Sequence, residues 1–268
     1  MKLFIDSAKL DEIREAYSWG IVEGVTTNPS LMKKAMAGKK VDMGSYIKQI
    51  LKVAGRTPVS LEVTTSDYDS MVREGKTLFK KFRRFGNVYI KIPVNPCLGE
   101  DCGKDMDGIK AIRNLSRAKI PVNCTLIFTP EQALLAAKAG AKFVSPFAGR
   151  EDDFIREKAH IKFDKKDYFA GVRKGKKIVS DNGITSGVDL IAKSVELFRK
   201  HNIKAEVLAA SIRNTRQLRN VGRAGADIAT MPFDVLKESV RHPKTVEGMK
   251  KFTEDIVPEY ARISGGRK

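Results

Sequence analysis

One lysine in this sequence stands where an amine can act as a nucleophile. The stretch Asn87–Val94 (NVYIKIPV) alternates in the manner of a strand, and Lys91 lies on the face opposite Ile90 and Ile92. If the apolar face packs on helices, Lys91 points into the interior, where burial disfavours the charged form of an amine. A neutral buried amine can attack a ketone and form a Schiff base. Two other interpretations stay open: a lysine on a half-exposed strand, and a lysine paired with a buried carboxylate.

Further polar side chains occur near the carboxyl ends of other strand-like segments. They are Asp6, Glu62, Asn123, Thr125, Ser145, Ser211 and Arg213. Each one alone is explained as a satisfied buried polar group, and Asn28 in TTNPS is explained as a helix N-cap. In a parallel barrel, however, the carboxyl ends of all strands meet at one mouth. The set therefore predicts a site with two carboxylates, one amine and several hydroxyl groups.

The segments that must position these side chains alternate between short strand patterns and longer amphipathic helical patterns. The expected strands are Lys2–Asp6, Val22–Thr27, Pro58–Thr64, Asn87–Val94, Pro121–Phe128, Lys142–Phe147, Glu206–Ser211 and Asp227–Met231. Two expected helices are Pro130–Ala139, which Gly140 ends, and Gly187–His201. Strand–helix alternation indicates a parallel sheet. Eight strands over about 230 residues predict a single (β/α)8 TIM barrel. The alternative is an open doubly wound sheet, but no Gly-rich phosphate-binding fingerprint follows the first strand.

Two stretches interrupt this rhythm, and we expect them to be insertions after strands 4 and 6 of one domain that spans residues 1–268. Asn95–Asp107 follows a strand and lacks helical periodicity. Asp153–Ser180 is weakly patterned and too long for an ordinary barrel loop, and its 9 Lys and Arg residues outnumber its 4 acidic residues. This basic excursion is either a lid over an anionic substrate or a solvated or oligomer-contact loop, and we favour the loop.

The whole chain is basic, with 50 Lys and Arg against 32 Asp and Glu and a formal net charge of +18. Such a charge fits an anionic substrate, a nucleic-acid partner or a lysine-rich solvated surface. We favour the solvated surface, because no recognisable nucleic-acid-binding motif accompanies the charge. We therefore expect no specific nucleic-acid partner.

The N-terminal residues MKLFIDSAKLDEI do not resemble a secretory signal, because Asp6 interrupts the apolar run. No stretch approaches the roughly 20 apolar residues of a membrane span, so we expect a cytoplasmic protein without a membrane partner. Cys97 and Cys102 are then expected to be reduced loop thiols, and a disulfide is the alternative. A metal site is not expected, because two thiols without a nearby His fall short of a four-ligand set.

Seven short segments of the chain are informative as an ordered set. In order they are FIDSA, VTTNPS, VYIKIPV, NCTLIF, ALLAAKAGAKFVSPFAGR, LAASIRN and AGADIATMPFDVL. Together they resemble the transaldolase family, which includes the fructose-6-phosphate aldolases, over nearly the whole chain except the two insertions. The resemblance implies sugar-phosphate substrates and no metal or organic cofactor, since a protonated imine replaces a Lewis acid. It also suggests a homo-oligomer that uses the C-terminal helix.

The resemblance implies a catalytic role for four residues. Lys91 matches the lysine that forms the imine with a ketose, so that the C3–C4 bond can break. Asp6 matches the carboxylate that removes the proton from the C4 hydroxyl group. Glu62 and Thr125 match the pair that positions a water molecule and moves protons during imine formation.

The same resemblance implies roles in substrate binding. Asn28 and Ser145 match groups that hydrogen-bond the dihydroxyacetone portion of the substrate. Ser211 and Arg213 match the phosphate site, and Arg150 matches a second phosphate arginine. Guanidinium forks suit phosphate better than the point charge of a lysine does.

Two positions favour one activity within the family. Glu62 and Phe147 resemble true transaldolases, whereas the aldolases carry Gln and Tyr there. Because Phe147 has no hydroxyl group to protonate a bound fragment, the sequence favours transfer of dihydroxyacetone to an aldose phosphate, as in the pentose phosphate pathway. The expected donors are sedoheptulose 7-phosphate and fructose 6-phosphate. The alternatives are a fructose-6-phosphate aldolase-like lyase and, supported only by charge, a polyanion or nucleic-acid binder.

Overall fold

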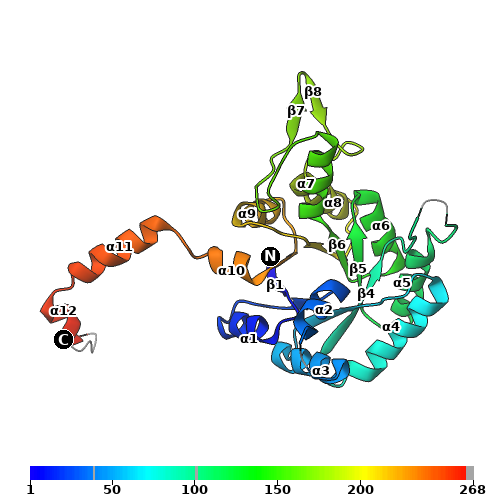
Figure 1. Ribbon diagram of the computed structural model, residues 1–268, viewed down its shortest axis with the longest axis horizontal. Helices are drawn as coiled ribbons and strands as arrows, with labels where there is room; N and C mark the ends of the chain where they lie inside the picture. Colours follow the sequence, from blue (N-terminus) through cyan, green and yellow to red (C-terminus); the bar gives the residue numbers. More distant parts are fainter. Residues whose placement is uncertain (39, 100–101, 264–268) are drawn as a thin grey trace.

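A computed structural model, which describes residues 1–38, 40–99 and 102–263, shows a closed barrel of eight parallel strands ringed by helices (Figure 1). The barrel order is β1-β10-β9-β6-β5-β4-β3-β2. These strands are β1 (Lys2–Asp6), β2 (Val25–Thr26), β3 (Pro58–Glu62), β4 (Asn87–Pro93), β5 (Val122–Ile127), β6 (Phe143–Pro146), β9 (Glu206–Ala209) and β10 (Ile228–Met231). The predicted TIM barrel is confirmed, and each observed strand lies within its expected segment.

The helices alternate with the strands along most of the chain. They are α1 (Leu10–Ser18), α2 (Pro29–Met36), α3 (Met43–Ala54), α4 (Tyr68–Phe82), α5 (Asp107–Arg117), α6 (Pro130–Ala139), α7 (Ala148–Lys158), α8 (Gly187–Lys200), α9 (Thr215–Arg223), α10 (Phe233–Glu238), α11 (Pro243–Glu254) and α12 (Pro258–Ile263). The expected helix Pro130–Ala139 is confirmed. Thr129 and Gln132 form a capping box at its start, and Gly140 ends it with a φ of 108°.

Strand β4 shows how the alternating pattern directs side chains to opposite sides of the barrel wall. Ile90 is fully buried and packs towards Gly75 of α4, where a Cβ atom would lie 3.2 Å from the Ile90 side chain. Tyr89, of opposite parity, stacks on Phe143 of β6 with ring centroids 4.4 Å apart. Phe143 also meets Phe4 of β1 edge-on. Aromatic rings therefore fill the amino-terminal part of the barrel interior, and Lys91 lies beyond them towards the carboxyl ends.

The basic excursion has more regular structure than its weak pattern indicated. Helix α7 continues to Lys158, so the expected boundary at residue 153 is wrong. Beyond it, an antiparallel hairpin of β7 (Val172–Lys174) and β8 (Lys177–Val179) projects from the barrel in Figure 1. Arg156 is only 3% exposed, and its guanidinium group lies between Phe163 and Phe169. The helical pattern was difficult to see in the sequence because an arginine is expected at the surface, whereas Arg156 is a core residue.

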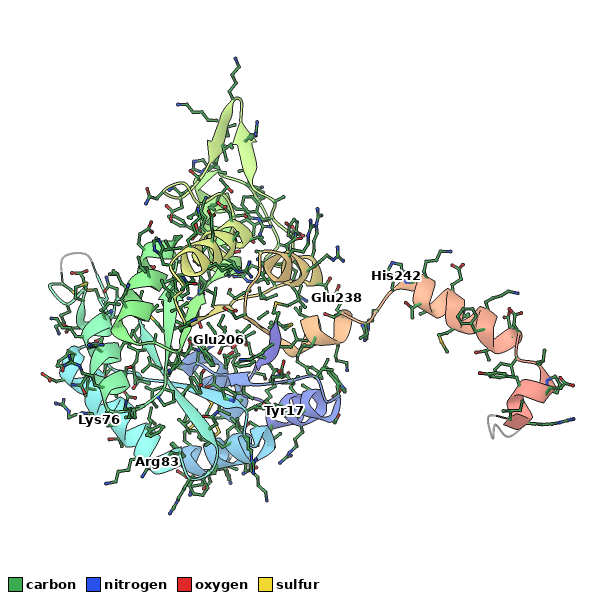
Figure 2. The ribbon with its side chains drawn as sticks, turned by 180° about the vertical axis from the view of Figure 1, so that it is seen from behind. Tyr17, Lys76, Arg83, Glu206, Glu238 and His242 are labelled. Atoms are coloured by element: carbon green, nitrogen blue, oxygen red, sulfur yellow. A yellow bond between two sulfur atoms is a disulfide. The ribbon has the colours of Figure 1, made fainter. Side chains whose placement is uncertain are left out.

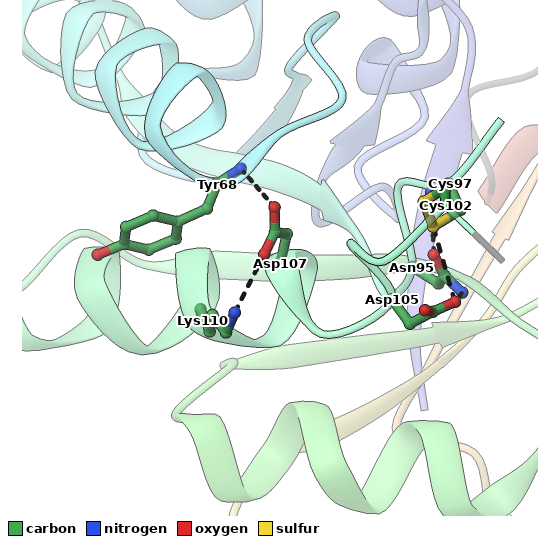
Figure 3. The surroundings of a disulfide bond; sticks show 7 residues. All are labelled: Tyr68, Asn95, Cys97, Cys102, Asp105, Asp107 and Lys110. Carbon is green, nitrogen blue, oxygen red and sulfur yellow. Dashed lines mark hydrogen bonds and ion pairs between the residues drawn. A yellow bond between two sulfur atoms is a disulfide. The ribbon is translucent and has the colours of Figure 1, made fainter.

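The loop between β4 and α5 contains a disulfide (Figure 3). Cys97 is bonded to Cys102, with their Cα atoms 5.9 Å apart. The interpretation of these residues as reduced thiols is therefore wrong. The loop folds back on itself because Asn95 Oδ1 accepts a hydrogen bond from the Cys97 amide while Asn95 Nδ2 donates to Asp105. A separation of five residues alone permits either redox state, so the sequence could not decide.

Helices α11 and α12 extend away from the barrel in Figures 1 and 2, and Figure 2 places His242 at the start of α11, well clear of the barrel. No residue of α11 is buried, and Val246, Met249 and Phe252 are at least 57% exposed. Within the described part of the chain, no helix is long and apolar enough to cross a membrane.

Candidate active site

The carboxyl ends of the barrel strands enclose a cavity of about 90 Å³. Its lining residues are Asp6, Thr26, Asn28, Lys91, Ser145, Phe147, Arg150, Leu208, Ala210, Ser211 and Thr230. Seven of the ten residues predicted to form the site are among them. Of the other three, Glu62 contacts Lys91, while Thr125 and Arg213 do not line the cavity.

Lys91 is 5% exposed and points into this cavity. Its Nζ lies 3.0 Å from Glu62 Oε2 and donates a hydrogen bond to the carbonyl oxygen of Thr27 at 3.2 Å. Glu62 is placed there because β3 and β4 pair in a register that sets Glu62 beside Lys91. The lysine is thus buried and paired with a carboxylate, so the interpretation of a half-exposed lysine is wrong, and its role as a nucleophile stays a prediction. A direct contact gives the ammonium proton a nearby acceptor.

Asp6 is the second carboxyl group of the cavity, at the end of β1. Burial raises the pKa of Asp6 above its ordinary value, and the positive charge of Lys91 and a hydrogen bond from Thr26 oppose that rise. A carboxylate held in this way can serve as a base with a usable proton affinity.

Two threonines that the sequence analysis did not select support Asp6. Thr26 Oγ1 donates to Asp6 Oδ1 at 2.7 Å and lies 2.6 Å from Thr230 Oγ1. A hydroxyl group has one proton, so Thr230 donates to Thr26 while Thr26 donates to Asp6. They come from β2 and β10, the strands that flank β1. The signal that could have found Thr26 is register, because it pairs directly with Asp6.

A buried hydrogen-bond chain holds Ser145, which lines the cavity. Ser145 Oγ donates to Asn123 Oδ1 at 2.6 Å, and Asn123 Nδ2 donates to Ser60 Oγ at 3.1 Å. All three residues are at most 1% exposed. Thr125 is also fully buried, and among the described residues its Oγ1 has no hydrogen-bond partner. A buried hydroxyl group without a partner is unusual and is available to a water molecule.

Asn28 joins the wall of the cavity to the start of α2. Its Oδ1 accepts a hydrogen bond from the Leu31 amide at 2.9 Å, so the N-cap interpretation is correct. Asn28 also lines the cavity. The two interpretations of this residue are therefore compatible, because the cap uses the side-chain oxygen and not the amide nitrogen.

The far end of the cavity carries positive charge. The guanidinium carbon of Arg150 lies 5.2 Å from the centre of the Phe147 ring. Ser211 adopts a φ of 60°, which turns the chain sharply after β9. Arg213 lies beside this end and is paired with Asp153, its Nη2 2.6 Å from Oδ2. Among the described residues, no group of three or more His, Cys, Asp or Glu side chains could hold a metal ion.

A buried lysine, two carboxyl groups and an arginine lie at the carboxyl ends of the strands of this TIM barrel. Such an arrangement is that of a TIM-barrel enzyme, and the sequence comparisons show to which enzyme family the chain belongs. Residues 3–261 match the family model described as transaldolase/fructose-6-phosphate aldolase. The chain therefore belongs to the transaldolase/fructose-6-phosphate aldolase family of enzymes.

Relatives of the chain carry a consistent name. A probable transaldolase of Thermoplasma acidophilum is 41% identical over 257 residues, which cover 95% of each chain. A probable transaldolase of Bacteroides thetaiotaomicron is 40% identical and covers 99% of this chain and 100% of the relative. That of Porphyromonas gingivalis is 41% identical over the full length of both chains.

Proposed function

We propose that this enzyme transfers a dihydroxyacetone unit from a ketose phosphate to an aldose phosphate through an imine at Lys91. The observation that carries the proposal is the buried Lys91, which is paired with Glu62 and lines one cavity together with Asp6 and Arg150. Family membership and the names of the relatives support it. We place the reaction in the pentose phosphate pathway in the cytoplasm, with sedoheptulose 7-phosphate or fructose 6-phosphate as donor.

Imine formation begins with a proton transfer. Glu62 accepts a proton from the Lys91 ammonium group across their 3.0 Å contact, and the neutral amine attacks the C2 carbonyl carbon of the ketose. The C2 oxygen is protonated and leaves as water, which yields the protonated imine. In the proposal, Glu62 returns that proton through a water molecule held with the free hydroxyl group of Thr125.

Carbon–carbon cleavage uses Asp6. The carboxylate removes the proton of the C4 hydroxyl group, and the C3–C4 bonding electrons move to the imine as an enamine forms. The aldehyde fragment departs with its new carbonyl group. An incoming aldose phosphate reverses these steps: the enamine carbon attacks its aldehyde, Asp6 returns the proton, and water then releases the new ketose from Lys91.

The remaining polar groups have binding roles in this proposal. Asn28 and Ser145 hydrogen-bond the dihydroxyacetone portion, which lies nearest Lys91. Ser211, Arg150 and Arg213 bind the phosphate group at the far end. Bidentate guanidinium–phosphate hydrogen bonds are strong and directional, so they also orient the ketose for attack.

Phe147 decides between transfer and simple cleavage. Its ring lines the cavity, is 9% exposed and lies under Arg150. A phenyl group cannot donate a proton to the enamine, so the three-carbon fragment is expected to stay on Lys91 until an aldehyde arrives. The second candidate function is the lyase, which releases free dihydroxyacetone. The decisive assay supplies fructose 6-phosphate with and without erythrose 4-phosphate: sustained turnover without the acceptor would reject transfer.

The variant Phe147→Tyr tests this role. We expect acceptor-independent release of dihydroxyacetone to rise about tenfold, because a phenol hydroxyl group can protonate the enamine. Enzymatic measurement of free dihydroxyacetone reports the result. The matched control is Phe128→Tyr, because Phe128 contacts the Phe147 ring but does not line the cavity. An unchanged release in Phe147→Tyr would show that this position does not control the outcome.

We also propose that the enzyme is a homo-oligomer in which α11 packs on another copy. The support is the apolar row Val246, Met249 and Phe252, which is exposed on a helix that lies away from its own barrel (Figure 2). Light scattering of the full chain after size exclusion should give a multiple of 29.8 kDa. Phe252→Asp should shift this mass to that of smaller species, and a monomeric wild-type chain would contradict the proposal.

A further inference from the structure

Arg213 stands in an unusual position for a residue expected to bind phosphate. It does not line the cavity, and its guanidinium group makes a bidentate ion pair with Asp153. Nη1 donates to Oδ1 at 3.1 Å, and Nη2 donates to Oδ2 at 2.6 Å. The two side chains are only 19% and 13% exposed. A bidentate pair shielded from water fixes the plane of the guanidinium group, which a surface pair does not do.

The inserted segment 163–169 adds contacts to the same region. Arg213 Nη1 faces the carbonyl oxygen of Lys165 at 3.5 Å, and Asn214 Nδ2 donates to the carbonyl oxygen of Lys166 at 3.0 Å. The segment is anchored on α9 as well, because Asn220 Nδ2 donates to the Tyr168 hydroxyl group at 2.6 Å. This part of the excursion is therefore anchored to the barrel, although residues 164–167 are themselves exposed.

Residues of α7 hold both the backbone and the side chain of Arg213. The Arg213 amide donates to Gln217 Oε1 at 2.9 Å, and Gln217 Nε2 donates to Asp152 Oδ2 at 2.8 Å. Asp152 and Asp153 are neighbours in α7. Asp152 thus positions the main chain of Arg213 through Gln217, and Asp153 positions the guanidinium group directly.

A count of donors shows what Arg213 has left for a ligand. A guanidinium group has five N–H bonds. Nη1 directs both of its own to Asp153 and Lys165, and Nη2 directs one to Asp153. The N–H of Nε and one N–H of Nη2 remain, and they lie along the same edge of the group. This pair is the fork that two phosphate oxygens can accept.

The Nε atom of Arg213, on the edge that carries the two remaining N–H groups, lies at the start of α7. A Cβ atom at Gly149 would be 2.8 Å from Arg213 Nε and 2.2 Å from the Ser211 carbonyl oxygen, so only glycine lets Arg213 pass there. The next residue, Arg150, lines the cavity. The N-terminal end of a helix also favours anions. Arg213 Nε therefore lies beside Gly149, next in sequence to the cavity-lining Arg150.

We infer that Asp153, together with segment 163–169, is a positioning element that holds Arg213 with its free N–H edge towards the phosphate group of the substrate. The inference rests on the proposed function, because it assigns a phosphate to that end of the cavity. It gives the insertion after α7 a role: its main chain completes the shell around a phosphate-binding arginine.

The test compares substrates with and without phosphate. In Asp153→Asn, we expect the KM for fructose 6-phosphate to rise about tenfold with kcat nearly unchanged, since one strong charge-assisted contact is lost. Single-turnover cleavage of unphosphorylated fructose, measured without an acceptor, should not change. Calorimetric titration with inorganic phosphate should show a similar loss of affinity. If Asp153→Asn does not fold, Asp153→Glu keeps the charge, displaces the guanidinium group and should raise the same KM.

The matched control is Asp181→Asn, which breaks the ion pair with Lys158 at the other end of the insertion and does not contact Arg213. It should leave both KM values unchanged. Equal losses with both substrates in Asp153→Asn, an unchanged KM, or a lower KM would each overturn the inference, the last by showing that Asp153 competes with phosphate. So would a wild-type enzyme that does not bind inorganic phosphate. Failure of the wild-type enzyme to form an adduct would instead refute the proposed function, and the phosphate titration would still decide the positioning role.

Discussion

Replacing Lys91 with Met should reduce turnover of fructose 6-phosphate by at least about 10⁴-fold, because no other group on the cavity wall can form the imine. Met keeps the length and the apolar stem of the side chain, so packing against the strand is retained. The Glu62 carboxylate loses its partner, but it is 15% exposed and can be reached by water. The loss should therefore appear in chemistry far more than in folding.

Borohydride trapping measures the nucleophile directly. The wild-type enzyme incubated with fructose 6-phosphate and borohydride should gain one three-carbon adduct, and peptide mass mapping should place it on Lys91. Lys91→Met should gain none. The control is Lys142→Met, which removes an exposed lysine from the amino-terminal side of β6. An adduct that persists in Lys91→Met would assign the imine to another lysine.

The position of Lys91 could be predicted because two independent regularities agree there. Strand alternation gave the side on which Lys91 lies, and the barrel rule gave the end at which catalytic groups gather. The first depends on local sequence, and the second depends on the succession of strands and helices along the chain. The ion pair with Glu62 depends on the register between β3 and β4, which the sequence does not specify.

The residues that hold Asp6 and Arg213 in place could not be predicted either, because their contacts depend on strand register and on packing between distant segments. Strand β2 has two residues, so Thr26 offered no alternation from which its direction could be determined. Asp153 was counted as part of a basic excursion, because the helical pattern of α7 is masked by its buried charged residues. Its partner Arg213 is 60 residues away, and only the packing of α7 against the turn after β9 brings them together.

The pH dependence of the reaction should carry the signature of Asp6. The carboxyl group must be ionised to accept the C4 proton, so activity should fall as the pH drops through its pKa. Burial raises that pKa, which places the acid limb of the rate profile above the range of an ordinary carboxyl group. Thr26 stabilises the ionised form by its hydrogen bond. Thr26→Val should therefore move the acid limb up by roughly one pH unit, and Thr26→Ser should restore it.

Replacing Asp6 with Asn should separate the two halves of the mechanism. Asn occupies the same volume and can accept the Thr26 hydrogen bond, but it cannot accept a proton, so C3–C4 cleavage should slow about 10³-fold. Imine formation uses Lys91 and Glu62 and should continue. Borohydride should then trap the intact six-carbon donor on Lys91 of Asp6→Asn, where the wild-type enzyme yields the three-carbon fragment. A three-carbon adduct formed at the wild-type rate would assign the base to another residue. Loss of all adducts would show that Asp6 is needed before the imine forms.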